Sequence, residues 1–132
     1  MDAEEQFAAR FKPYVPQYLS EVQDVLTSMV GGAPTFLKPG FNGLGRNLES
    51  EFACVSEGIA GVRDKLGEER YARLMALLAQ AKMLFLEDQN DDNGKTKQGC
   101  DLLWDMDEII EEVRKERYAA GIPDEEGEVT GD

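Results

Sequence analysis

One run of apolar residues constrains the fold of this chain more than any other feature. After Asn47 the apolar side chains recur at alternating steps of four and three residues: Leu48, Phe52, Val55, Ile59, Val62 and Leu66. This spacing places all of them on one face of an α-helix, where they can interlock with neighbouring helices. Asn47 is a suitable N-cap and Gly67 a suitable end, so we predict one helix between them.

Four further segments have helical spacing, and no segment shows the sustained alternation of a strand. They cover residues 3–11, 16–30, 68–86 and 97–119. We therefore predict an all-α fold, a four-to-five-helix bundle, in a single domain of residues 1–120. The Gly/Pro-rich segment 31–46 is expected to be a long loop. The acidic segment 121–132 lacks the apolar content to order itself, so we predict a flexible, disordered tail.

The charge of the chain is strongly negative and unevenly distributed. The net charge is −13, and residues 101–132 carry 3 basic and 12 acidic side chains, a net of −9. Such a field repels nucleic acid and anionic membranes and attracts basic proteins. We predict a basic protein partner, with no nucleic-acid or membrane binding. A homo-oligomer is possible.

Composition also limits the chemistry and the location of the protein. The chain has no histidine, the commonest general base and transition-metal ligand, and its two cysteines lie in helical patterns. The first residues form no secretory signal, and no apolar run is long enough for a membrane span. We therefore predict a cytoplasmic protein without cofactor or metal, and not an enzyme.

The acidic segment 88–100 invites comparison with an EF-hand loop. If Gly94 takes the sixth position of such a loop, Gln89 takes the first and Cys100 the twelfth. The first position normally carries Asp and the twelfth a bidentate Glu. We therefore interpret the segment as a solvated turn between two helices.

The last predicted helix carries the most informative pattern. Its apolar positions point one way, and four acidic residues recur at helical spacing on the opposite side: Asp101, Asp105, Glu108 and Glu112. Glu111 and Trp104, the only tryptophan, lie beside this acidic ridge. Tryptophan is a favoured interface anchor, and a carboxylate rim around it suits a basic partner. The alternatives are a merely solubilising face, or a Trp104 that another element covers.

The loop 31–46 contains three large apolar residues, Phe36, Leu37 and Phe41. One interpretation has them packed onto the bundle. The other has them contacting a partner, and on that basis Phe36 and Phe41 join the predicted partner-binding residues. The glycines of this loop do not indicate a phosphate site, because no predicted strand precedes them.

Two segments resemble a known family. Residues 70–92, RYARLMALLAQAKMLFLEDQNDD, and residues 102–113, LLWDMDEIIEEV, look like small helical immunity proteins encoded beside bacterial type VI secretion effectors. The resemblance implies a protein that occludes the active site of a cognate toxin. Without a signal peptide, that toxin would act on a cytoplasmic target.

Three functions follow as hypotheses. The first is a cytoplasmic immunity protein or inhibitor that binds and occludes a basic toxin domain. The second is an adaptor or secretion chaperone that binds a partner helix through apolar residues, including the methionines. The third is a phage-encoded nucleic-acid mimic that blocks a DNA-binding protein.

Overall fold

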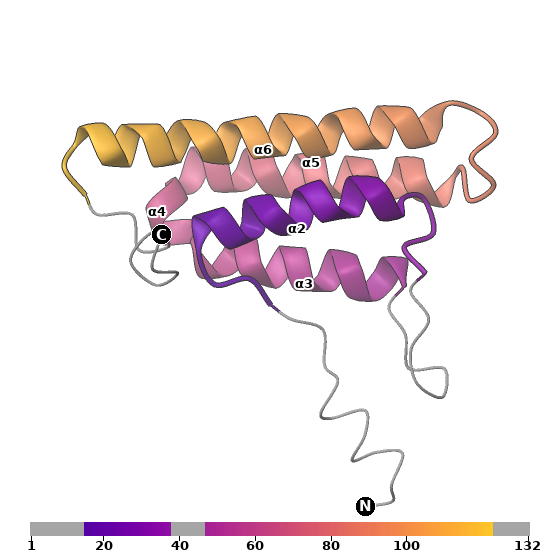
Figure 1. Cartoon of the computed structure of the whole chain (residues 1–132), viewed down its shortest axis with the longest axis horizontal. Helices are drawn as coiled ribbons and strands as arrows, with labels where there is room; N and C mark the ends of the chain where they lie inside the picture. Colours follow the sequence, from indigo (N-terminus) through magenta and orange to yellow (C-terminus); the bar gives the residue numbers. More distant parts are fainter. Residues whose placement is uncertain (1–14, 38–46, 123–132) are drawn as a thin grey trace, which may run out of the picture.

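Five helices make up the described part of this computed structural model, which covers residues 15–37 and 47–122 (Figure 1). They are α2 (Leu19–Gly32), α3 (Leu48–Gly61), α4 (Arg63–Leu66), α5 (Glu68–Leu86) and α6 (Lys95–Ala119). These ranges contain no strand, so the all-α prediction is confirmed. The predicted helix 3–11, Phe41 and residues 123–132 of the predicted tail lie outside the described residues.

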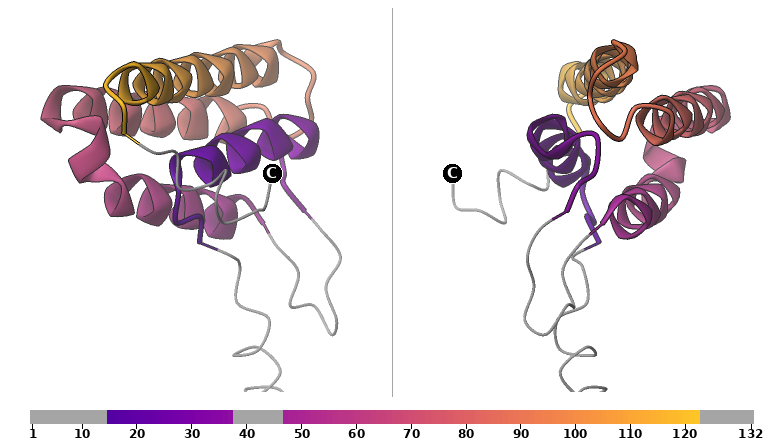
Figure 2. Two further views of the ribbon diagram at one scale, coloured as in Figure 1. Left: turned by 60° about the vertical axis from the view of Figure 1, so that its left-hand side comes forward. Right: turned by 90° about the vertical axis from the view of Figure 1, so that its right-hand side faces the viewer.

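The four long helices form an up-down-up-down bundle. Viewed end-on, they occupy four corners, with α2 diagonally opposite α5 and α3 diagonally opposite α6 (Figure 2). Both α2 and α5 pack against α3 and α6, so every neighbouring pair of long helices is antiparallel. The face formed by α2 and α6 therefore lies opposite the face formed by α3 and α5.

The apolar stripe that predicts the third helix is buried throughout, but the helix is interrupted. α3 ends at Gly61, Val62 leaves the helical conformation, and α4 adds one further turn. Val62 and Leu66 are still buried. Gly67 then reverses the chain into α5 with a positive φ of 82°, a conformation that glycine adopts without strain.

The start of α3 is capped as the sequence predicts. The Asn47 side chain accepts a hydrogen bond from the Ser50 amide at 2.9 Å, and the Ser50 hydroxyl accepts one from the Asn47 amide at 3.0 Å. This reciprocal pair satisfies two backbone donors at the helix terminus. α2 begins at Leu19 rather than at Pro16, because Pro16 is buried against Gly58 of α3.

An aromatic cluster joins three elements at one end of the bundle. Phe36, Phe52 and Phe85 pack edge to face, with ring centroids 5.1 to 6.0 Å apart. All three are buried, and Phe85 is fully enclosed. On its other side, the Phe85 ring meets α6 at Gly99, where a Cβ atom would lie 2.6 Å from the ring. The absence of a side chain at Gly99 therefore allows α6 to approach α5 closely.

Substitution of Gly99 by alanine should destabilise the fold. The added methyl would collide with the enclosed Phe85 ring, at a cost of about 1–3 kcal/mol. Gly31→Ala is the matched control, because Gly31 is also helical and a Cβ there meets nothing within 4 Å. It should leave stability unchanged or raise it by up to about 1 kcal/mol. Chemical denaturation followed by circular dichroism measures both, and equal effects would contradict the close approach at Gly99.

Candidate partner-binding site

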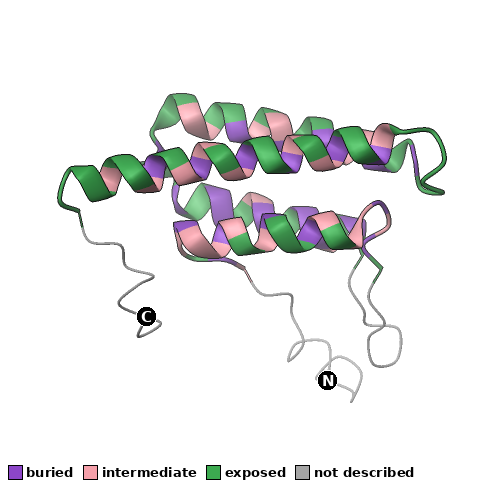
Figure 3. Ribbon diagram, turned by 45° about the horizontal axis from the view of Figure 1, so that its top comes forward, coloured by how far each residue is buried: buried purple, intermediate pink, exposed green. Residues whose placement is uncertain are grey.

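The middle of α6 is a dense strip of carboxylates. Between Lys97 and Arg114 this helix carries six acidic side chains and no basic one. Its inward positions are apolar and fully or nearly fully buried: Leu103, Met106, Ile110 and Val113. Since these hold one side of the helix against the bundle, the carboxylates project from the other side. Figure 3 shows the exposed positions running along the outer side of α6.

All four residues of the predicted acidic ridge are exposed, but protein partners neutralise its ends. Asp101 pairs with Lys97 at 3.1 Å, and Glu112 pairs with Arg70 of α5 at 2.6 Å. In the middle of the ridge, the side chains of Asp105 and Glu108 make no hydrogen bond or ion pair with any residue of the described ranges. The unneutralised charge of the ridge is therefore concentrated around these two residues.

Arg70 binds the α5 side of α6 at two points. Besides Glu112 it contacts Glu116, with an N–O distance of 2.9 Å. The hydrogen bonds to Glu116 and Glu112 raise the pKa of the Arg70 guanidinium above its ordinary value, and the hydrogen bond from Arg70 lowers the pKa of Glu116. Because Arg70 is already engaged by these carboxylates, the side of α6 that faces α5 offers little free negative charge.

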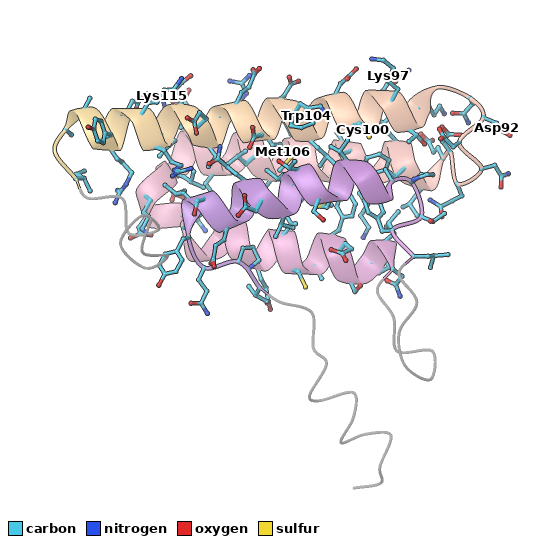
Figure 4. All side chains as sticks on the ribbon, in the orientation of Figure 1. Asp92, Lys97, Cys100, Trp104, Met106 and Lys115 are labelled. Atoms are coloured by element: carbon cyan, nitrogen blue, oxygen red, sulfur yellow. The ribbon has the colours of Figure 1, made fainter. Side chains whose placement is uncertain are left out.

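Trp104 lies at the centre of the unneutralised region. Its side chain is 44% exposed, whereas Met106, two residues further, is fully buried. Figure 4 shows Trp104 about midway along α6. Asp101 and Glu108 lie about one helical turn on either side of it, and Asp105 is adjacent in sequence. The described elements thus leave almost half of the only tryptophan accessible, beside carboxylates.

The boundary between α6 and α2 adds two carboxylates that were not among the predicted site residues, Asp107 of α6 and Asp24 of α2. Burial raises the pKa of Asp107 above its ordinary value, and repulsion from Glu111 and Asp24 adds to the effect, whereas a hydrogen bond from Gln23 and the charge of Arg114 oppose it. These two carboxylates therefore lie within electrostatic range of each other.

Side-chain hydrogen bonds join α2 to α6 beside these carboxylates. Gln23 of α2 donates to Glu111 at 3.2 Å and accepts from Arg114 at 2.7 Å. α2 has no basic residue, so its side of the boundary supplies no compensating charge. The candidate site, called here the acidic face, consists of Trp104 and the surrounding carboxylates Asp24, Asp101, Asp105, Asp107, Glu108 and Glu111. Glu112 belongs to the predicted ridge but is held by Arg70.

The prediction that Phe36 contacts a partner is wrong for this structure. Phe36 is only 2% exposed and belongs to the aromatic cluster with Phe52 and Phe85. The alternative, in which it packs onto the bundle, describes its position. Its neighbour Leu37 is 71% exposed. The second predicted loop residue, Phe41, lies outside the described residues.

The acidic turn between α5 and α6 is organised around one buried carboxylate. Asp88 is 2% exposed and accepts hydrogen bonds from the backbone amides of Asp92, Asn93 and Thr96 at 2.8, 3.2 and 2.9 Å. Its Oδ1 thus accepts from two amides of the turn and its Oδ2 from one amide in the first turn of α6. The interpretation as a solvated turn fits the exposed residues 89–94 but missed this role of Asp88.

Comparison with known proteins finds no counterpart: no family model matches the chain, and neither a curated protein nor a solved structure does. The resemblance to immunity proteins therefore stays a prediction. Across residues 15–37 and 47–122, no helix combines the length and apolar character that crossing a bilayer requires.

Replacing Asp88 tests the buried carboxylate. Burial raises its pKa, but the amide hydrogen bonds outweigh this effect and lower the pKa below its ordinary value. The charged form therefore stabilises the fold above about pH 4, and this contribution is lost as the pH falls through the lowered pKa. Asp88→Asn should lower the thermal midpoint by roughly 5 °C at pH 7, and by less below pH 4.

The matched control is Asp92→Asn, which removes an exposed carboxylate in the same turn. It should leave the thermal midpoint nearly unchanged over the same pH range. If the two substitutions gave the same pH profile, the carboxylate of Asp88 would not be what organises the turn.

Proposed function

We propose that this protein is a cytoplasmic inhibitor of the immunity type, which uses the acidic face to occlude the basic active-site cleft of a cognate toxin domain. The observation that carries the proposal is the half-exposed Trp104 beside Asp105 and Glu108, neither of which has a partner in the described ranges. A tryptophan of this kind contributes binding free energy when a partner covers its ring. The surrounding charge accelerates encounter with a basic partner and selects against acidic ones.

Three features of the site support an inhibitor over an enzyme. The carboxylates lie on the convex outer side of a helix, whereas the groove lined by Phe52, Met75 and Leu78 lies between α3 and α5. The site offers a broad surface rather than a pocket for a small substrate. Enzymes that act on nucleic acids or nucleotides have basic clefts, to which a rigid helix lined with carboxylates is complementary.

The test uses a candidate toxin domain encoded beside this gene, with binding measured by calorimetry. Trp104→Ala should weaken the complex by about 30-fold or more, as the loss of an interface anchor does. The double reversal Asp105→Lys/Glu108→Lys should weaken it about 100-fold at low salt and less at high salt, since screening reduces the repulsion.

The matched control is Glu57→Lys/Asp64→Lys, which reverses two exposed charges away from the acidic face. It should reduce affinity far less than the Asp105/Glu108 reversal. Tight binding that survives both Trp104→Ala and the Asp105/Glu108 reversal would place the interface elsewhere. Competition by duplex DNA for a partner that has no catalytic activity would instead favour the nucleic-acid mimic, because the partner would then be a DNA-binding protein rather than a toxin.

The adaptor or chaperone function has one observation in its favour, the groove between α3 and α5. This groove has a volume of about 290 Å³ and is lined by Phe52, Met75 and Leu78 among others. An adaptor that binds a partner helix there would lose affinity on Met75→Glu, would tolerate Trp104→Ala, and would show little salt dependence. The inhibitor proposed above predicts the opposite response to each change.

A further inference from the structure

The outer face of α5 is apolar and has no partner within the described structure. Met83 and Leu86 are 56% and 46% exposed, although they belong to a bundle with a well-formed core. Ala72, Ala76 and Ala79 are exposed on the same side of the helix, at the spacing that puts residues on one face. Isolated exposed apolar residues are ordinary, but a continuous strip of them marks an interaction surface.

The groove between α3 and α5 continues this strip. Ala79 and Met75 line the groove as well as the α5 face, and Phe52 and Leu78 form its floor. Lys82 and Glu49 bridge the groove with an ion pair of 2.8 Å. The two charged residues that line the groove therefore neutralise each other.

Charge decides which molecule can approach this surface. The other three long helices carry more acidic than basic side chains, whereas α5 carries two acidic and three basic ones. Figure 2 shows that α5 lies diagonally across the bundle from α2 and next to α6. Two copies of a chain with a net charge of −13 repel each other least when their α5 faces meet, because α5 is the long helix of the described part that has no excess of acidic side chains.

The side chains of the strip are also complementary to themselves. Small residues occupy its first half, at Ala72 and Ala76, and large ones its second half, at Met83 and Leu86. If two copies of α5 cross antiparallel at Ala79, Leu86 of one copy faces Ala72 of the other. Met83 then faces Met75. A two-fold axis thus matches Leu86 to Ala72 and brings the two methionines together, along a helix of 19 residues, about 28 Å long.

We propose that this protein forms a two-fold symmetric homodimer through the outer face of α5, centred on Ala79 and extended by the groove with α3. The two acidic faces of such a dimer point in opposite directions and are both accessible. This inference does not depend on the proposed inhibitory function, because α5 contributes no residue to the acidic face.

Sedimentation velocity of the full chain at micromolar concentrations tests the dimer. The unmodified protein should sediment as a single species with twice the 14.7 kDa mass of one chain. Met83→Glu should weaken self-association about 100-fold and give a monomer, because the dimer would bury this charge near the axis without a partner. The matched control Ser28→Glu adds the same charge to an exposed position of α2 and should leave the dimer intact.

A disulfide across the axis gives a second readout that does not rely on disruption. Ala79→Cys should form a covalent dimer under mild oxidation, since the axis brings the two residues 79 together, whereas Ser28→Cys should not. A monomer at all concentrations overturns the proposal, as does a dimer that resists Met83→Glu. A monomer that captures a partner's helix on this face also overturns it and supports the adaptor function.

Discussion

The narrow apolar stripe of α6 is the contact on which the rest of this structure depends. This helix is the longest of the described part, yet most of its residues are polar and only six of its 25 positions are buried. Helical propensity alone does not hold such a helix in place, so its orientation comes from packing. Leu103, Met106 and Ile110 enter the core, and the close contact between Gly99 and Phe85 fixes the rotation of the helix about its own axis. That rotation directs the carboxylates outward.

Local spacing predicts the parts of this fold that depend on residues close together in sequence. The four long helices, the N-cap at Asn47 and the inward residues of α6 all follow from patterns within one or two helical turns. α5 begins and ends where its pattern does. The spacing does not predict the interruption of α3 after Gly61. The apolar period of α3 continues across the interruption to Val62 and Leu66.

The candidate site could be predicted only in part, since part of it is tertiary. The exposure of Asp105 and Glu108 follows from the helical period. The neutralisation of Glu112 by Arg70 does not, because 42 residues separate the two in sequence. The contribution of Asp24 likewise depends on α2 lying beside α6. Phe36 illustrates the reverse: an apolar residue in a glycine-rich segment has no period to follow, and only the aromatic cluster shows that it is buried.

The position of Trp104 determines what intrinsic fluorescence can report about this protein. The chain has a single tryptophan, and it lies on the surface rather than in the core. Its emission in the folded state is therefore shifted toward that of a hydrated indole, and unfolding shifts it less than it would shift the emission of a core tryptophan. A ligand that covers it would shift the emission to shorter wavelength. In this protein, tryptophan fluorescence is a poor measure of folding and a direct measure of occupancy of the acidic face.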